Sequence, residues 1–328
     1  MNSPDSHQIV IAQTPGGPDV LALERRALPA LAPDEILIKA ASCGVNRPDQ
    51  FERMGFYPPP PGAPAGLGLE AAGEVAAIGK SVSGFAPGDR VMGLVSGGGY
   101  SDYVIAKAGS CLPVPEAVDL ADAGGLPETV FTVWANVFDT AALLHNETLL
   151  VHGGASGIGT TAIQMAKAHG ARVIATAGSD ARCDLCRELG ADIAINYREA
   201  VFENVVNEAG GADVILDMVG GDYVEKNINC ANAGGRIVSI AFLKGSRIEA
   251  DLMRVMLKRL VLTGSTLRSR PDDEKARLTA DIKDQVLPWL ADGRLRPIID
   301  SRFALEEVVK AHERLDSGAH AGKILLQI

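Results

Sequence analysis

Four glycines fall within seven residues of the chain, in the stretch Gly153-Gly154-Ala155-Ser156-Gly157-Ile158-Gly159. An apolar run precedes them, and a run with helical spacing follows them. A strand that turns through glycines into a helix lets an anion approach the backbone, where free N–H groups and the positive end of the helix dipole stabilise it. Gly154 and Gly159 match the G-x-G-x-x-G pattern, Ser156 takes the place of the second glycine, and Gly157 is an extra one. The stretch predicts a binding site for the pyrophosphate of a dinucleotide.

The next predicted strand ends in TAGSDAR, residues 176–182. Sites for NAD place an acid there to bind the ribose 2′-hydroxyl, whereas a 2′-phosphate requires a nearby basic group. Gly178 leaves room, Ser179 can donate a hydrogen bond, and Arg182 can supply charge. These residues predict that the bound dinucleotide is NADPH. Two alternatives stay open: Arg182 is a solvated helix residue, or Asp180 reaches the ribose.

The elements that position these residues form a regular alternation from residue 147 to 266. Six continuous β-rich runs are separated by helical segments, the first of them Gly157 to His169. Such runs require a parallel sheet buried on both faces. The fold class is therefore α/β, with a doubly wound, six-stranded parallel Rossmann sheet over residues 123–267.

The first 122 residues read as a compact, mostly β domain, because short β runs are separated by Gly and Pro turns. After residue 268 the chain continues through two helical patterns to the strand GKILLQI, and this tail is expected to complete the first domain. YPPPPGAP, residues 57–64, is expected to form a fixed loop, with a recognition motif for a polyproline-binding domain as the alternative.

The composition of the chain restricts the kinds of molecule that it is expected to bind. The net charge of −10 argues against nucleic acid and anionic membranes, so a small molecule is the expected ligand. The 13 N-terminal residues lack the features of a secretory signal, and the five cysteines are typical of a reducing compartment, which predicts a cytoplasmic protein. Cys183-x-x-Cys186 lacks the partner ligands of a zinc site and is expected to be two helix residues near a core, with a redox or metal site as the alternative.

These features resemble the medium-chain dehydrogenase/reductase superfamily, in particular its zinc-free NADPH quinone oxidoreductases. The resemblance covers nearly the whole chain and is closest to the p53-inducible branch. It rests on the segments GGPDVL, NRPDQFERMGFYPPPPG, GLEAAGEV, DMVGGDYVEKNINC and LRSR. It implies a GroES-like catalytic domain beside the Rossmann domain, and commonly a homodimer, for which LVLTGST offers an edge strand.

Zinc enzymes of this superfamily hold a catalytic metal through three ligands, where this chain has Asn46, Leu69 and, in the third place, Glu128. The cysteine-rich lobe that binds structural zinc is replaced by GLVSGGGYSDYV, which has no cysteine. An amide, a leucine and one carboxylate cannot form a tetrahedral site. We therefore expect no metal.

The resemblance also implies the site residues. Asn46, Tyr57 and Thr132 would line the nicotinamide and substrate, although Asn46 could merely cap a turn. Gly154 to Gly159, including Ser156, Gly157 and Ile158, would hold the pyrophosphate. The 2′-phosphate would be bound by Ser179, Arg182 and Tyr197, next to Gly178. The later strand ends would border the nicotinamide through Gly220, Ile240, Ala241, Phe242 and Leu267. His152 is expected to be a packed side chain.

The function expected from these residues is NADPH-dependent reduction of a quinone without metal or flavin. A quinone spreads the incoming charge through its π system and so needs no Lewis acid. Two alternatives stay open: a reductase of α,β-unsaturated carbonyls or enoyl thioesters, and a non-catalytic NADPH-binding redox sensor.

Overall fold

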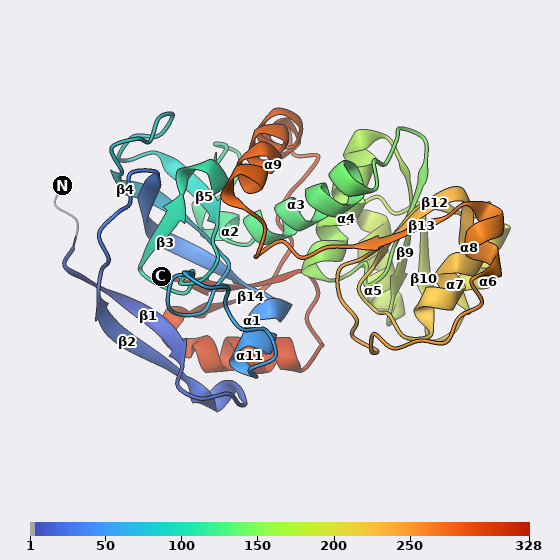
Figure 1. Ribbon diagram of the computed structural model, residues 1–328, viewed down its shortest axis with the longest axis horizontal. Helices are drawn as coiled ribbons and strands as arrows, with labels where there is room; N and C mark the ends of the chain where they lie inside the picture. Colours follow the sequence, from blue (N-terminus) through green and yellow to red (C-terminus); the bar gives the residue numbers. More distant parts are fainter. Residues whose placement is uncertain (1–3) are drawn as a thin grey trace. The chain divides into compact units, whose positions relative to one another are not determined.

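The computed structural model describes residues 4–328, which form two compact units (Figure 1). Unit 1 runs through Phe131 and takes up the chain again over Arg268–Gly293 and Pro297–Ile328. Unit 2 comprises Thr132–Leu267 and Arg294–Arg296. The division falls between Phe131 and Thr132, within a helix, whereas we expected it after residue 122.

Unit 2 contains one six-stranded sheet in the order β10-β9-β8-β11-β12-β13, with every neighbouring pair parallel. Its strands are β8 (Thr148–Val151), β9 (Arg172–Ala177), β10 (Ile193–Asn196), β11 (Ala212–Asp217), β12 (Ala231–Ser239) and β13 (Val261–Gly264). The intervening helices are α4 (Gly157–His169), α5 (Asp180–Glu188), α6 (Phe202–Glu208), α7 (Tyr223–Cys230) and α8 (Met253–Lys258). This arrangement confirms the predicted Rossmann fold, and the observed α4 has the predicted bounds.

The central strands β8, β9 and β11 are largely buried because most of their residues are apolar. β8 has four buried residues and no polar face toward solvent. Helices cover the sheet, with α4 and α5 packed on β9 and α7 and α8 on β12 (Figure 1). A segment of π-helix, Trp134–Thr140, precedes the first strand and was not predicted.

Unit 1 is built on a seven-stranded sheet in the order β14-β15-β3-β4-β5-β7, with β6 paired to β3. Its strands are β3 (Glu35–Val45), β4 (Glu70–Ile78), β5 (Arg90–Leu94), β6 (Tyr103–Lys107), β7 (Cys111–Pro113), β14 (Ile299–Ala304) and β15 (Lys323–Gln327). β1 (Ser6–Ala12) and β2 (Leu21–Ala27) form a separate antiparallel hairpin. The helices are α1 (Arg47–Arg53), α2 (Leu120–Ala123), α3 (Pro127–Val133, which crosses into unit 2), α9 (Asp272–Gln285), α10 (Leu287–Ala291) and α11 (Val308–Asp316).

The C-terminal strand β15 lies inside the sheet of unit 1. It pairs antiparallel with β3, so that Ile324 lies opposite Val45 and Leu325 opposite Gly44. One step further along this register, Lys323 faces Asn46. The tail of the chain therefore brings a charged residue to the end of β3. No helix among residues 4–328 is long and apolar enough to cross a membrane.

Candidate functional site

The sheet of unit 2 collects the predicted cofactor residues at one edge. Its strand order reverses between β8 and β11, which is the point where open α/β sheets bind ligands outside the carboxyl ends of their strands. The glycine stretch follows β8, Gly178 and Ser179 follow β9, and Tyr197 follows β10. Gly220, Ile240 to Phe242, and Leu267 come after β11, β12 and β13. We call these strand ends the carboxyl edge.

The glycine turn has no space for side chains at two positions. A Cβ added to Gly154 would lie 2.7 Å from Cys186 Sγ and 2.8 Å from Ala175 Cβ, and one added to Gly159 would overlap the Gly153 carbonyl oxygen. Ser156 caps α4 instead of matching a glycine, because its Oγ accepts a hydrogen bond from Gly159 N at 3.0 Å. The turn is a close-packed cradle at a helix N-terminus, and it fits the pyrophosphate of a dinucleotide.

The end of β9 brings Gly178 together with the polar groups that were predicted to lie near it. Tyr197 Oη lies 2.6 Å from the point that a Cβ of Gly178 would occupy, so the two predicted residues are adjacent. Ser179 caps α5, with Oγ accepting from Arg182 N at 3.4 Å. Asp180, the rival for the ribose, accepts a hydrogen bond from Asn196 Nδ2 at 2.9 Å. Its carboxylate thus has a partner in the protein.

Hydrogen bonds to Asp217 position the segments that follow β11 and β12. Asp217, the last residue of β11, accepts from Gly220 N at 3.2 Å through Oδ1, and its carbonyl oxygen accepts from Ile240 N at 2.8 Å. Gly220 has a φ of +65°, which favours glycine, and an added Cβ would lie 2.6 Å from Phe242 Cδ1. Phe242 is itself exposed, whereas Leu267 is buried. Gly220 and Phe242 are therefore in contact at the carboxyl edge.

Two other features of unit 2 are part of its core. His152 is fully buried between Phe202 and Tyr223, and its ring nitrogens lie 2.8 Å from Asn227 Oδ1 and 3.1 Å from Thr176 Oγ1. Burial lowers the pKa of His152, so the ring is neutral and serves packing.

Cys183 and Cys186 are free and lie on the buried side of α5. Burial raises the pKa of Cys186 to about 12, so its thiol is protonated at neutral pH. Among the described residues no group of His, Cys, Asp and Glu side chains could hold a metal ion. These observations favour the packing interpretation of both cysteines.

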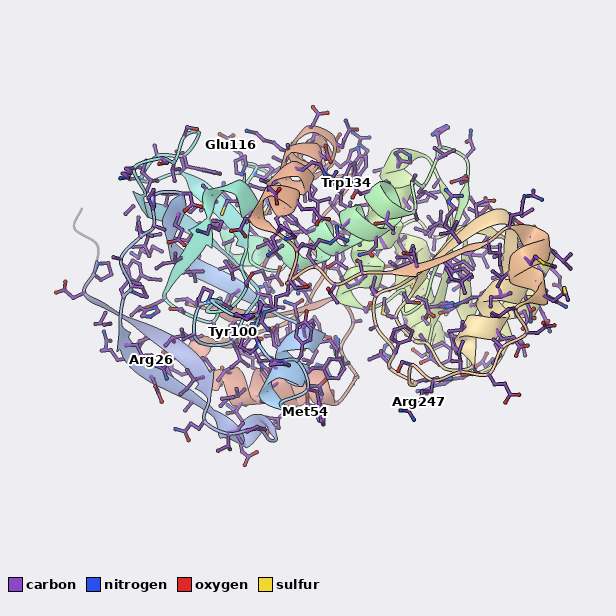
Figure 2. All side chains as sticks on the ribbon, viewed as in Figure 1. Arg26, Met54, Tyr100, Glu116, Trp134 and Arg247 are labelled. Atoms are coloured by element: carbon purple, nitrogen blue, oxygen red, sulfur yellow. The ribbon has the colours of Figure 1, made fainter. Side chains whose placement is uncertain are left out.

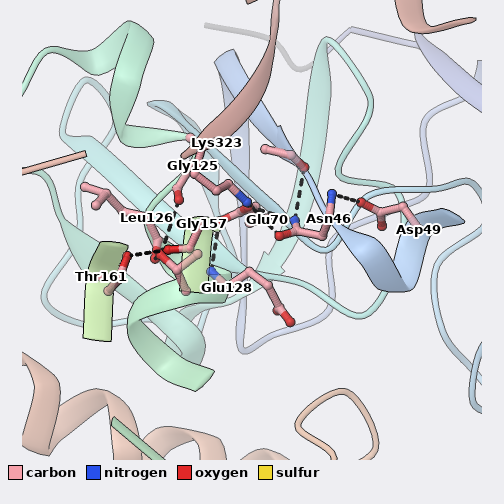
Figure 3. A network of polar contacts seen from close by, with 12 residues as sticks. Asn46, Asp49, Glu70, Gly125, Leu126, Glu128, Gly157, Thr161 and Lys323 are labelled. Atoms are coloured by element: carbon pink, nitrogen blue, oxygen red, sulfur yellow. Dashed lines mark hydrogen bonds and ion pairs between the residues drawn. The ribbon is translucent and has the colours of Figure 1, made fainter. Parts of the chain in front are cut away.

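Unit 1 contains a buried polar group that we call the Asn46 cluster: Asn46, Glu70 and Lys323 (Figure 3). Lys323 Nζ donates to Asn46 Oδ1 and to Glu70 Oε1, both at 2.6 Å. Asn46 Nδ2 donates to Glu70 Oε1 at 2.8 Å and to the Gly44 carbonyl oxygen at 3.2 Å. Both N–H groups of the Asn46 amide are therefore used inside the protein.

Three separate strands bring the Asn46 cluster together. Asn46 follows β3, Glu70 begins β4 and Lys323 begins β15, and both neighbours pair antiparallel with β3. Gly44 is required at the crossing point, because an added Cβ would overlap the Glu70 carboxylate and lie 2.9 Å from Lys323 Nζ. The side chain of Asn46 turns into this cluster, while its backbone N–H donates to Asp49 Oδ2 at the N-terminus of α1, so Asn46 is also the N-cap residue of that helix.

The Asn46 cluster does not fit a catalytic zinc. Leu69 offers only hydrocarbon, and the oxygen of Asn46 already accepts from an ammonium group. A divalent cation at Asn46 would also be repelled by Lys323. The donor set is thus unsuited to tetrahedral zinc, which prefers Cys, His and carboxylate ligands.

Tyr57 lies beside charged residues of the same unit. The guanidinium carbon of Arg268 is 5.6 Å from the centre of the Tyr57 ring, and Arg268 Nη1 donates to Glu52 Oε2 at 2.6 Å. Burial raises the pKa of Tyr57, so its hydroxyl stays protonated at neutral pH. Its hydroxyl has no hydrogen-bond partner within residues 4–328 and can serve a ligand.

The half-buried Glu128 also lies in this region, and its backbone N–H donates to Glu70 Oε2 at 2.8 Å. Desolvation, together with the nearby Glu70 carboxylate, raises the pKa of Glu128 to about 8. Thr132 belongs to unit 2, where it is buried in α3 and its carbonyl oxygen accepts from Asn136 Nδ2 at 2.8 Å.

A second buried network holds the helix that follows Asn46. Asp49 Oδ2 accepts from Asn46 N and from the hydroxyl of Tyr100, both at 2.7 Å; Tyr100 is labelled in Figure 2 and fully buried. His312 Nε2 lies 3.3 Å from that hydroxyl, and His312 Nδ1 lies 3.1 Å from Arg53 Nη1. Because a guanidinium only donates, His312 is neutral with its proton on Nε2.

Several of these residues were not predicted as site residues from the sequence. They are Glu70, Lys323, Arg268, Tyr100 and His312. The available signal was a lysine at a position that the period of the apolar strand GKILLQI places in the sheet. Such a lysine requires a buried partner.

Comparison with known proteins gives matches over both units. Residues 32–116 match the alcohol dehydrogenase GroES-like domain, and residues 157–284 match the zinc-binding dehydrogenase domain. The quinone oxidoreductase of Rattus norvegicus is 31% identical over 317 residues, which cover 95% of this chain and 94% of the relative. That of Pseudomonas aeruginosa is 33% identical, with 95% and 96% covered.

The solved structures agree. The Escherichia coli quinone oxidoreductase, determined in complex with NADPH, superimposes with a TM-score of 0.85 at 28% identity. The match covers 98% of this chain and all of that one.

Proposed function

The chain belongs to the quinone oxidoreductase family of medium-chain dehydrogenases/reductases, and we propose that it reduces quinones with NADPH. The observation that carries this proposal is the carboxyl edge, where a close-packed glycine turn is followed by a second strand ending in Gly178 and Ser179 with Arg182 nearby. Bound NADPH supplies the hydride. The protein binds, orients and shields the reactants.

The same proposal assigns a role to each predicted site residue. The turn from Gly154 to Gly159 holds the pyrophosphate, and Ser179, Arg182 and Tyr197 hold the 2′-phosphate. The later strand ends border the nicotinamide with Gly220, Ile240, Ala241, Phe242 and Leu267. Thr132 contributes to the same surface of unit 2.

In unit 1, the hydroxyl of Tyr57 donates a hydrogen bond to the substrate oxygen. The amide of Asn46 cannot donate, because both of its N–H groups are bonded to Glu70 and Gly44. Asn46 instead holds the wall of the site in place through its contact with Lys323. A quinone delocalises the added charge, so one hydroxyl and correct positioning suffice for its reduction without a metal.

The test is NADPH oxidation by the purified protein with ortho-quinones, para-quinones and enals, each with and without a chelator. We expect turnover of quinones that the chelator leaves unchanged. Faster turnover of enals would identify an enone reductase. NADPH binding without turnover of any acceptor would identify a redox sensor, and loss of activity with loss of stoichiometric zinc would overturn metal independence.

We further propose that the protein forms a homodimer through the edge of the sheet in unit 2. Among residues 4–328, β13 pairs only with β12, and its Val261 and Leu262 are exposed. Met256 and Leu257 of α8 are also exposed. An unpaired edge strand with apolar neighbours is suited to pairing with a second copy of itself. Leu262→Lys should convert a dimer into a monomer in analytical ultracentrifugation, whereas a wild-type monomer would contradict the proposal.

A cytoplasmic location is proposed from the cysteines. All five are free and buried in the described structure. A reducing compartment keeps such thiols intact. Fractionation of expressing cells, with the protein followed by antibody, tests this location.

A further inference from the structure

Unit 1 contains a cavity of about 320 Å³ whose lining residues all belong to this unit. Its walls come from the proline-rich loop, from β5 and β6, and from the segment that leads into α9. The apolar part consists of Pro60, Pro61, Leu94, Val95 and Ile105. Its volume is near the lower end of the range for small-molecule sites, about 300–1,000 Å³.

Four cationic side chains line this cavity together with the acidic residues Glu35 and Asp272, and Lys107 and Arg270 are the two cations that lie in ion pairs away from Glu52. Lys107 Nζ lies 3.1 Å from Asp34 and 3.2 Å from Glu35. Arg270 Nη1 lies 2.8 Å from Glu274. These two charges are balanced within the protein.

The other two cations, Arg268 and Lys275, are 6% and 5% exposed, and of these two Arg268 alone forms an ion pair, with Glu52. Arg268 Nη1 pairs with Glu52, but Arg268 Nη2 is buried without a hydrogen-bond partner in the described residues. Lys275 Nζ donates to the Arg268 carbonyl oxygen at 2.9 Å and to Ser96 Oγ at 3.3 Å. Within residues 4–328 it forms no ion pair, and its third N–H has no acceptor.

An unpaired buried ammonium is unfavourable, and an orphaned guanidinium N–H adds to the cost. Burial lowers the pKa of Lys275, and the Asp272 and Glu128 carboxylates oppose this shift without forming an ion pair with the ammonium group. We propose that the cavity binds a small organic anion, with its carboxylate on Lys275 and Arg268 and its apolar body against Pro60, Pro61 and Ile105. The ligand is the acidic substituent of a substrate or a separate carboxylate.

Benzoate is the probe, and benzyl alcohol is its neutral counterpart. Calorimetry on the full-length protein should show binding of benzoate and none of benzyl alcohol. Lys275→Gln should weaken benzoate at least tenfold, about 1.4 kcal/mol. Lys107→Gln, on the same cavity, should change the affinity less than twofold because that ammonium is already paired. Arg182→Ala should leave the affinity unchanged, which separates this site from the cofactor phosphate.

Absence of benzoate binding to the wild type would overturn the proposal, as would equal weakening by the two lysine variants. A crystal soaked with 4-bromobenzoate locates the ligand even if Lys275→Gln fails to fold. Anomalous bromine signal beside Pro60 and Pro61 supports the proposal, and signal only elsewhere refutes it. None of these measurements depends on quinone turnover.

A comparison of KM for a carboxylate-bearing quinone and for its methyl ester distinguishes the two sources of the anion, the substrate and a separate carboxylate. This comparison rests on the proposed quinone reduction. A lower KM for the acid that is lost in Lys275→Gln assigns the site to the substrate. Equal KM values, with benzoate binding intact, assign it to a separate carboxylate.

Discussion

The two units position their candidate site residues by opposite means. At the carboxyl edge each residue follows its own strand closely, and the backbone does much of the positioning, as where Ile240 N donates to the Asp217 carbonyl oxygen. In the Asn46 cluster three side chains that are far apart in the sequence hold one another. A backbone-built site should tolerate side-chain changes one at a time, whereas a cluster of mutually bonded side chains should fail as a unit.

The largest expected effect is in the Asn46 cluster. Lys323→Met leaves the Glu70 carboxylate buried without its cation, which should lower the free energy of unfolding by about 3–5 kcal/mol. Urea unfolding followed by circular dichroism measures it. The double variant Lys323→Met/Glu70→Gln removes both charges and should recover most of the loss. If single and double variants are equally unstable, then charge pairing is not what holds the cluster.

The next effect belongs to the carboxyl edge and should leave stability unchanged. Arg182→Ala should weaken NADPH by roughly 10- to 150-fold, or about 1.5–3 kcal/mol, through loss of a charge-assisted hydrogen bond. NADH lacks the phosphate and should bind as before. Arg187→Ala is the matched control, because Arg187 lies on the same helix and already pairs with Asp184. Fluorescence titration that shows both cofactors weakened alike by Arg182→Ala would assign the choice to another group.

The same difference between the carboxyl edge and the Asn46 cluster explains which of their features could be predicted from the sequence. The strands and the glycine turn of unit 2 are local patterns, so the Rossmann sheet and the bounds of α4 could be predicted from apolar runs and glycine spacing. The pairing of Lys323 with Asn46 depends on the register between β15 and β3, which no local pattern contains. The β1–β2 hairpin was missed because its β2, LALERRA, carries charged residues in place of an apolar run.

A smaller effect should appear in the pH dependence of stability. Burial and the adjacent Arg53 charge lower the pKa of His312 to about 3, whereas an unfolded histidine titrates near 6.5. Between these values the unfolded chain binds the extra proton, so stability falls as the pH falls, by up to about 1.4 kcal/mol per pH unit. His312→Gln cannot titrate at this position. Between pH 6.5 and 5 its free energy of unfolding should therefore fall less than that of the wild type, by about 1.4 kcal/mol. Parallel pH profiles for the two proteins would contradict this assignment.

The smallest expected effect is that of Tyr57→Phe, which tests whether the substrate end of unit 1 contains a committed acid. Tyr57 is outside the Asn46 cluster, so its loss should leave Asn46, Glu70 and Lys323 bonded as before. A reduced quinone can take its proton from water, and the Tyr57 hydroxyl, whose pKa is raised by burial, contributes only a hydrogen bond. We therefore expect kcat/KM for quinones to fall about tenfold or less, below the usual range of about 10²–10⁴ for removal of a general acid. NADPH titration is the control, since the cofactor residues of the carboxyl edge are untouched. A loss near 10⁴-fold with NADPH binding intact would make Tyr57 the proton donor, and the reaction would then depend on this one half-buried side chain.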